Sequence, residues 1–235
     1  MNTVIRERLA RLRAVMAKHQ VDYYLCPTAD CHHSEYVADH FKAREYFCGF
    51  TGSNGTLVVS NDHAGMWTDG RYFIQAEKEM EGTGVELFRM ADEGVPTINE
   101  FLKDRMKAGE TLCFDGRVVS AGFGRKLEED LASDQIRIVY DLDLAEEAWP
   151  ERPPLPVHDL FVVEDAVAGK SAAEKLGEVR EKLAANRTDA LFLTSLDDIC
   201  WLLNIRGNDV ECSPVALCYA WITKDQAILF IQEEE

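Results

Sequence analysis

The stretch from Trp149 to Pro156 constrains the fold of this chain more than any other segment, because four of its eight residues are proline. Proline fixes φ and lacks the N–H that helices and sheets need, so such a stretch forms a stiff, extended connector. The sequence therefore predicts two domains, at residues 1–150 and 157–235, joined by a linker at 151–156. At 235 residues, the chain is long enough to form two hydrophobic cores.

Before the linker, the hydrophobic pattern alternates between helical and strand periods. Apolar residues three or four apart predict a first helix, and the apolar run at 23–26 predicts a strand. Two short apolar runs, at 56–60 and 64–68, predict a hairpin. Further helices are expected at 71–80, 97–106 and 120–132, and further strands at 85–90, 111–115 and 136–141. This alternation favours an α/β fold, with a mixed β-sheet flanked by helices.

The same pattern begins again after the linker. Helical periodicity at 171–186 is followed by an apolar run at 190–193, as the first helix is followed by the first strand. Five identities share an offset of 167 residues: Leu9, Arg13, Ala17, Asp22 and Asp30 match Leu176, Arg180, Ala184, Asp189 and Asp197. The hairpin segment 58–64 aligns with 221–227 at an offset of 163. We therefore predict a duplicated fold, and a truncated second copy because Glu235 aligns opposite Arg71 or Tyr72.

The charge balance argues against two classes of partner. The formal net charge is −17, so a phosphate backbone or an anionic membrane surface would be repelled. No apolar run approaches the roughly 20 residues of a membrane helix, and the charged start of the chain is unlike a signal peptide. We therefore expect a cytoplasmic protein that binds neither nucleic acid nor a membrane.

The cysteines and histidines do not form a recognisable metal site. The seven cysteines are an odd number without C-x-x-C spacing, so we expect reduced thiols. Cys26, Cys31, His32 and His33 gather within eight residues, but a structural zinc site needs a second pair of ligands and none is evident. We interpret this cluster as incidental. No His-x-x-x-His pair is present, so we expect no metal site and no catalytic residue in this chain.

The glycine-rich segment from Gly49 to Thr56 is not expected to bind a nucleotide. A phosphate-binding loop opens a helix whose N–H groups meet the anion, whereas a predicted strand follows this segment. The segment also lacks the G-x-G-x-x-G and G-x-x-x-x-G-K-[ST] spacings. A tight turn with close backbone packing is the better interpretation.

Arg71 is the candidate binding residue. It follows Asp69-Gly70 and is expected in the first turn of a helix, where a cation opposes the positive end of the helix dipole. A planar guanidinium in such a place suits a carboxylate or a peptide carbonyl as a forked donor. A surface arginine without a special role remains the alternative.

Several motifs resemble one family. In the first domain they are Pro27 to Tyr36 (PTADCHHSEY), Gly49 to Thr56 (GFTGSNGT) and Met66 to Phe73 (MWTDGRYF). The linker and the run from Trp201 to Pro214 fit the same family. With these motifs in this order, the whole chain resembles the N-terminal part of the long, three-domain type of Xaa-Pro aminopeptidase, aminopeptidase P. Asn54 is a small departure, because the family often has a small residue there.

The resemblance implies two creatinase-type N-terminal domains, followed by a catalytic domain that lies outside this sequence. That domain would hold two manganese ions on two Asp, one His and two Glu ligands, and would hydrolyse peptides with proline second. None of those ligands is recognisable in this chain, so the chain alone is expected to be inactive. The resemblance also implies that Arg71, in the Asp-Gly-Arg-Tyr-Phe motif, contacts the substrate, and that the full-length enzyme is a homodimer.

A second hypothesis assigns the chain to another functional class. The histone chaperone FACT also uses a creatinase-like N-terminal region, so a catalytically dead module that binds peptides or histones remains open. Intact Asp, Asp, His, Glu and Glu ligands in the coding sequence beyond Glu235 would favour the peptidase.

Overall fold

The computed structural model describes residues 2–232, except for the side chain of residue 134. It divides into two compact units. Unit 1 comprises the residues up to Glu35 together with Phe41–Pro153, and unit 2 comprises Tyr36–His40 together with the residues from Pro154 onward. Each unit is described by itself.

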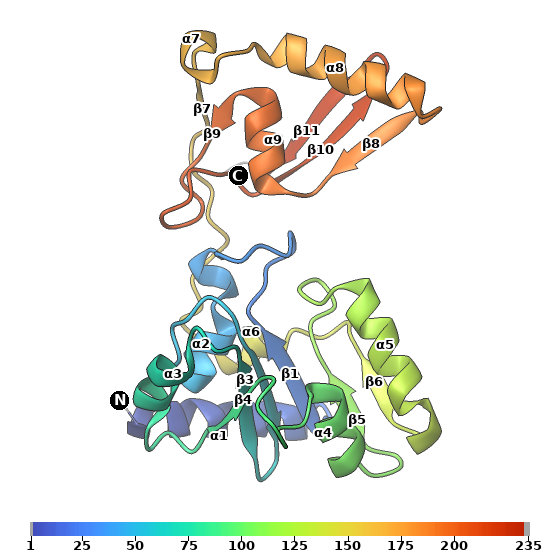
Figure 1. Cartoon of the computed structure of the whole chain (residues 1–235). Coiled ribbons are helices and arrows are strands. Elements are labelled where there is room, and N and C mark those ends of the chain that lie inside the picture. Colours follow the sequence, from blue (N-terminus) through green and yellow to red (C-terminus); the bar gives the residue numbers. More distant parts are fainter. Residues whose placement is uncertain (1, 233–235) are drawn as a thin grey trace. The chain divides into compact units, whose positions relative to one another are not determined.

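Unit 1 is built on a six-stranded mixed sheet with the strand order β4-β3-β2-β1-β5-β6 (Figure 1). The strands are β1 (Tyr23–Pro27), β2 (Thr56–Ser60), β3 (Ala64–Thr68), β4 (Glu86–Arg89), β5 (Thr111–Cys113) and β6 (Arg137–Val139). Only β2 runs antiparallel to its neighbours. The carboxyl ends of the other five strands therefore lie along one edge of the sheet.

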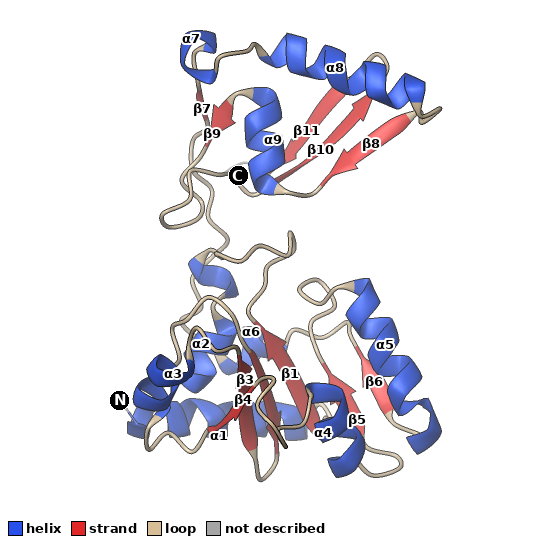
Figure 2. Ribbon diagram, viewed as in Figure 1, coloured by secondary structure: helices blue, strands red, loops and turns tan. Residues whose placement is uncertain are grey.

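Helices cover both faces of this sheet (Figure 2). They are α1 (Asn2–Lys18), α2 (Ala43–Cys48), α3 (Phe73–Met80), α4 (Ile98–Arg105), α5 (Ala121–Leu131) and α6 (Leu144–Ala148), with a short 3-10 helix at Ala132–Asp134. A further 3-10 helix, Asp39–Phe41, has its first two residues in unit 2 and Phe41 in unit 1. Alternate strand residues point to opposite faces. Leu57 and Met66 pack with α1, α2, α3 and α6, whereas Leu25, Val58 and Trp67 pack with α4 and α5.

Unit 2 contains a three-stranded antiparallel sheet with the order β11-β10-β8. Its elements are β7 (Phe161–Val162), α7 (Asp165–Ala168), α8 (Ala172–Ala185), β8 (Ala190–Leu193), α9 (Leu196–Leu203), β9 (Ile205–Arg206), β10 (Cys218–Thr223) and β11 (Ala227–Ile231). Strands β7 and β9 form a separate antiparallel pair. Leu191, Ala220 and Ile222 pack under α8 and α9, so these helices cover one face of the larger sheet.

The predicted duplication is confirmed by strand order, register and one repeated hydrogen bond. The order β3-β2-β1 in unit 1 corresponds to β11-β10-β8 in unit 2. Arg13 of α1 donates from Nε to the carbonyl of Ser60 at 2.9 Å, and Arg180 of α8 donates from Nε to the carbonyl of Thr223, also at 2.9 Å. These pairs lie at the offsets seen in the sequence. In each copy the helix is thus tied to the turn of the hairpin.

The α/β class is confirmed, and the element boundaries differ locally from the prediction. The helix expected from Arg71 begins at Phe73, and the strand expected at 111–115 ends at Cys113. Thr97 is the N-cap of α4, because its hydroxyl accepts the backbone N–H of Glu100 while the Glu100 carboxylate accepts the N–H of Thr97. This reciprocal capping box fixes where the helix starts.

A buried lysine joins the helices of unit 2. The Lys175 side chain is 3% exposed, and its Nζ donates to the carbonyl of Trp201 and to Oδ1 of Asn204, both at 2.6 Å. Asn204 ends α9 in the left-handed conformation, with φ of 53°, and its Nδ2 donates to the carbonyl of Lys170 at 2.9 Å. The lysine therefore neutralises the carbonyl end of α9, where a cation is favourable.

We expect Lys175→Met to destabilise unit 2 by about 2–4 kcal/mol, because the buried Asn204 and the part-buried carbonyl of Trp201 would lose their donor. Urea unfolding followed by tryptophan fluorescence measures the change. Lys182→Met is the matched control on the same helix, since Lys182 is exposed and its loss should cost less than about 1 kcal/mol. Equal losses in the two variants would show that the buried hydrogen bonds contribute nothing.

Candidate functional site

Four loops of unit 1 meet at the carboxyl edge of its sheet. They follow β1, precede β2, follow β3 and follow β5, and the first two are joined by a hydrogen bond from the N–H of Thr28 to the carbonyl of Gly55 at 2.7 Å. Ligands of open α/β sheets bind at the carboxyl ends of the strands. This edge also contains Arg71, so it is the candidate binding site of unit 1.

The structure places Arg71 in the turn before α3, which corrects the expected position in the first helical turn. Asp69 holds it there: Oδ1 accepts the backbone N–H and the Nε–H of Arg71, both at 3.0 Å, and Oδ2 accepts from Nη2 at 2.9 Å. The expectation that Arg71 opposes the dipole from inside the helix is therefore wrong. A local carboxylate stabilises the arginine through a forked, charge-assisted pair.

Further polar side chains surround this pair. Glu35 accepts a hydrogen bond from Ser53 Oγ at 2.9 Å, and Ser53 Oγ lies 2.7 Å from the hydroxyl of Tyr72. Asn54 Nδ2 donates to Oδ2 of Asp69 at 2.5 Å. We call the group the Arg71 cluster, and its members are Glu35, Ser53, Asn54, Asp69, Arg71 and Tyr72. Three separate loops therefore contribute to one polar surface.

The charges of Asp69 and Arg71 are fixed over a wide pH range. The Arg71 guanidinium and the Asn54 amide hold the pKa of Asp69 well below its usual range, and Asp69 raises the pKa of Arg71. An acid whose pKa is lowered on folding keeps its pairing above the unfolded pKa and loses it as pH falls through the folded pKa. The pair therefore persists at neutral pH and begins to weaken only in strong acid.

One edge of the Arg71 guanidinium forms only a weak contact with the protein. Its Nε and Nη2 face Asp69, whereas Nη1 lies 3.4 Å from Oε1 of Glu35, beyond the usual range of about 2.7–3.2 Å. The side chain is 59% exposed. A carbonyl or carboxylate oxygen of a ligand can thus approach Nη1 and Nη2 together.

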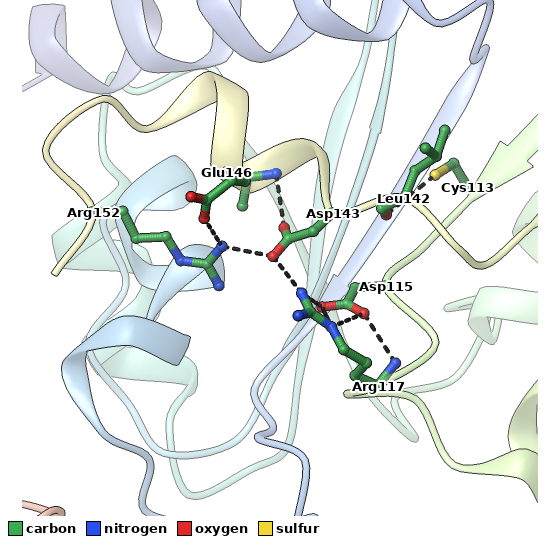
Figure 3. A network of polar contacts seen from close by, with 8 residues as sticks. Cys113, Asp115, Arg117, Leu142, Asp143, Glu146 and Arg152 are labelled. Carbon is green, nitrogen blue, oxygen red and sulfur yellow. Dashed lines mark hydrogen bonds and ion pairs between the residues drawn. The ribbon is translucent and has the colours of Figure 1, made fainter. Parts of the chain in front are cut away.

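A second Asp-Gly-Arg triplet, Asp115-Gly116-Arg117, follows β5 and repeats the local geometry. Asp115 accepts from the N–H and Nε of Arg117, both at 2.9 Å, and from Nη2 at 2.8 Å. Arg117 Nη2 also donates to Asp143 at 2.8 Å, and Asp143 accepts from Arg152 at 2.6 Å (Figure 3). Arg117 thus donates to two carboxylates, Asp115 and Asp143. Because its local geometry matches that of Arg71, substitutions at Arg117 serve as a control for substitutions at Arg71.

Arg44 holds the glycine-rich loop, residues 49–56, through buried hydrogen bonds to its backbone carbonyls. It is 3% exposed, and its Nε donates to Oγ1 of Thr28 at 2.9 Å while its two terminal nitrogens donate to the carbonyls of Phe50 and Gly52. A Cβ at Gly52 would lie 2.2 Å from the Phe50 ring. The predicted tight turn with close packing is therefore confirmed.

The cluster of cysteines and histidines is divided between the core and a loop. Cys26 lies buried in β1, and burial raises the pKa of its thiol. In the following loop, Oδ1 of Asp30 accepts the backbone N–H groups of His32 and Ser34 at 2.8 and 2.9 Å. Among the described side chains of residues 2–232, no three His, Cys, Asp or Glu residues are grouped so as to hold a metal ion. No described helix is long and apolar enough to span a membrane.

The family can now be assigned. Residues 8–142 match the family described as the creatinase/prolidase N-terminal domain, and residues 151–235 match a second family of the same description. The chain therefore belongs to the creatinase/prolidase N-terminal domain family. It contains two copies of this domain.

Relatives confirm the resemblance to Xaa-Pro aminopeptidases. A probable Xaa-Pro aminopeptidase P from Sordaria macrospora is 38% identical over 97% of this chain and 38% of its own length. Aminopeptidase P2 from Arabidopsis thaliana is 37% identical over 99% of this chain and 33% of its own length. The X-prolyl aminopeptidase from Caenorhabditis elegans, described as a cytosolic enzyme with a di-nuclear active site, matches with a TM-score of 0.90 and 31% identity over 98% of this chain. This chain spans 39% of that structure.

Of the site residues, the sequence predicts Arg71, but it does not predict the residues that position Arg71 and the neighbouring loop. The Asp-Gly-Arg triplet that recurs at Asp115 is the signal for the local pairing of Arg71 with Asp69. Arg44 gave a weaker signal, as an arginine between apolar and aromatic residues close to the glycine-rich segment. Its three acceptors come from two loops, so no spacing rule could have revealed them.

Proposed function

We propose that this chain is the non-catalytic N-terminal region of a metal-dependent Xaa-Pro aminopeptidase, which removes the N-terminal residue from peptides with proline second. The observation that carries the proposal is the match of nearly the whole chain to enzymes of that name. The chain spans about two fifths or less of the length of those relatives, so catalysis is assigned to the remaining part of the protein. A cytoplasmic location and a homodimer of the full-length enzyme belong to the same proposal.

Within this function, Arg71 contacts the bound peptide. Asp69 fixes the orientation of the guanidinium, and the edge formed by Nη1 and Nη2 offers two parallel donors. Such a fork suits the carbonyl or terminal carboxylate of a short peptide. Arg71 is a substrate-binding residue in this proposal, and no residue of this chain takes part in bond cleavage.

The metal site lies outside this chain in the proposal. The Caenorhabditis elegans relative has a di-nuclear active site, and we assign two manganese ions to the corresponding region of the full-length protein. The ions would activate the water that attacks the peptide bond. The described residues of this chain offer no matching group of ligands, so its own role is to bind and orient the peptide.

We expect calorimetric titration of the 235-residue chain with Mn²⁺ to show no stoichiometric binding in the sub-micromolar range. A hard divalent cation needs several converging oxygen or imidazole ligands. In the full-length protein, by contrast, two ions should bind, and their removal by a chelator should abolish cleavage that added Mn²⁺ restores. A tight site in the short chain would contradict the assignment of the metal to the remaining part.

The alternative function is a catalytically dead module that binds peptides or histones. Reading the coding sequence beyond Glu235 distinguishes the two, because a peptidase needs the Asp, Asp, His, Glu and Glu ligands. Loss of those ligands, together with histone binding by the purified full-length protein, would favour the alternative.

A further inference from the structure

Asn54 of the Arg71 cluster has one end of its side-chain amide bonded and the other end open. Its Nδ2 donates to Oδ2 of Asp69 at 2.5 Å. A carboxylate accepts hydrogen bonds but cannot donate one, so this contact fixes the nitrogen toward Asp69 and leaves Oδ1 on the other side. Within the described residues, no hydrogen bond reaches Oδ1, and Asn54 is exposed. The side chain therefore offers an acceptor to a ligand.

This acceptor lies next to the donor edge of Arg71. Asn54 Nδ2 and Arg71 Nη2 donate to the same oxygen, Oδ2 of Asp69, at 2.5 and 2.9 Å. The two side chains are thus neighbours on one carboxylate, and together they present donors and an acceptor. An extended peptide residue presents its own C=O and N–H on one side, as it does in an antiparallel ladder. Arg71 and Asn54 can therefore bind both groups of a single residue.

The formal charges of the Arg71 cluster favour an uncharged ligand group. Glu35 and Asp69 are acidic and Arg71 alone is basic, so the cluster has an excess of one negative charge. Oε1 of Glu35 lies 3.4 Å from Nη1 of Arg71, beside the place that a ligand oxygen would take. A terminal carboxylate would be repelled there, whereas a peptide carbonyl would not.

We propose that Arg71 and Asn54 together bind one residue of the substrate that follows its proline, with Arg71 donating to the carbonyl and Asn54 Oδ1 accepting the N–H. The proline has no N–H, and the carbonyl before it is the one that is cleaved, so the bound residue is the third or a later one. The inference rests on the proposed function and narrows its substrate class. Peptides that continue past the third residue, or that end in an amide, are preferred to tripeptides with a free carboxylate.

Methylation of the peptide nitrogen of the third residue tests the role of Asn54 in the full-length protein with Mn²⁺. The methyl group replaces the N–H, so kcat/KM for a proline-second tetrapeptide should fall by at least about tenfold in the unsubstituted protein. In Asn54→Ala the same methylation should have an effect at least about fivefold smaller, because the acceptor is absent. Each comparison is a ratio within one protein, so a general loss of activity in Asn54→Ala cancels.

Asn99→Ala is the matched control, because the amide of Asn99 also donates to a carboxylate, that of Asp130, but lies outside the Arg71 cluster. In this variant, methylation should have the same effect as in the unsubstituted protein. If methylation instead has equal effects in the unsubstituted protein and in Asn54→Ala, the N–H is not bound by Asn54 and the inference is overturned.

A proline-second tripeptide and its C-terminal amide test the charge argument. The amide should be cleaved with a kcat/KM at least about threefold higher, and Glu35→Gln should reduce this difference because it removes the excess negative charge. A free tripeptide cleaved as well as its amide would overturn the inference while the proposed function stands. No cleavage of any proline-second peptide by protein that has bound its metal would overturn the proposed function, and the inference with it.

Discussion

Replacing Arg71 with alanine in the full-length protein is expected to lower kcat/KM for a proline-second tripeptide by roughly ten- to a hundredfold. The reason is the loss of a forked, charged donor that Asp69 holds in position through hydrogen bonds of 2.9 and 3.0 Å. The thermal midpoint should change little, because the side chain is 59% exposed and its partners remain solvated. Steady-state kinetics and a thermal melt on the same preparation provide both numbers.

Arg117→Ala is the matched control, because Arg117 forms the same local pair with Asp115 but also bonds to Asp143. Its removal should lower the thermal midpoint more than Arg71→Ala does, and kcat/KM less. Arg71→Lys separates charge from geometry, since an ammonium cannot reproduce the fork. Unchanged kinetics in Arg71→Ala would show that this arginine does not contact the peptide. Parallel losses of activity and stability would assign it a structural role.

Replacing Arg44 with methionine is expected to destabilise unit 1 by about 3–5 kcal/mol. The guanidinium is almost fully buried and satisfies Thr28 and the carbonyls of Phe50 and Gly52 at once. Methionine replaces only the aliphatic part of the arginine side chain, so the acceptors lose their donors and a cavity is left where the guanidinium was. Denaturant unfolding of the 235-residue chain measures the difference.

Two further substitutions make the Arg44 result specific. Arg44→Lys keeps the charge but cannot reach three acceptors, so it should fall between the wild type and Arg44→Met. Arg125→Met removes an exposed arginine from α5 and should change stability by less than about 0.5 kcal/mol. If Arg44→Met costs no more than Arg125→Met, the buried guanidinium does not hold the glycine-rich loop.

The fold class and the duplication could be predicted because both depend on periodicity. Long amphipathic helices such as α1 and α8, and short apolar strands such as β2, leave clear patterns in the sequence. Short helices do not: α2 has six residues and α6 has five, and each is stabilised by burial against other elements more than by its own propensity. Helix ends are also poorly defined by periodicity, so the helix predicted from Arg71 begins at Phe73.

The candidate site was only partly predictable for a related reason. The pairing of Asp69 with Arg71 is local, so the Asp-Gly-Arg triplet could have revealed it. Glu35 and Ser53, in contrast, come from loops that the sheet brings together across many residues of sequence. Arg117 has the same local pair as Arg71, but its distant carboxylate, Asp143, lies at 2.8 Å, whereas Glu35 lies 3.4 Å from Arg71. Pairing order, which sequence patterns do not specify, decided which groups meet.

The most direct test of the assignment compares two tripeptides that differ only in the second residue, proline or alanine, as substrates of the full-length protein with Mn²⁺. An Xaa-Pro aminopeptidase should release the first residue of the proline peptide with a kcat/KM at least about a hundredfold higher than that of the alanine peptide. Equal values for the two peptides, or no cleavage of either by protein that has bound its metal, would contradict the account.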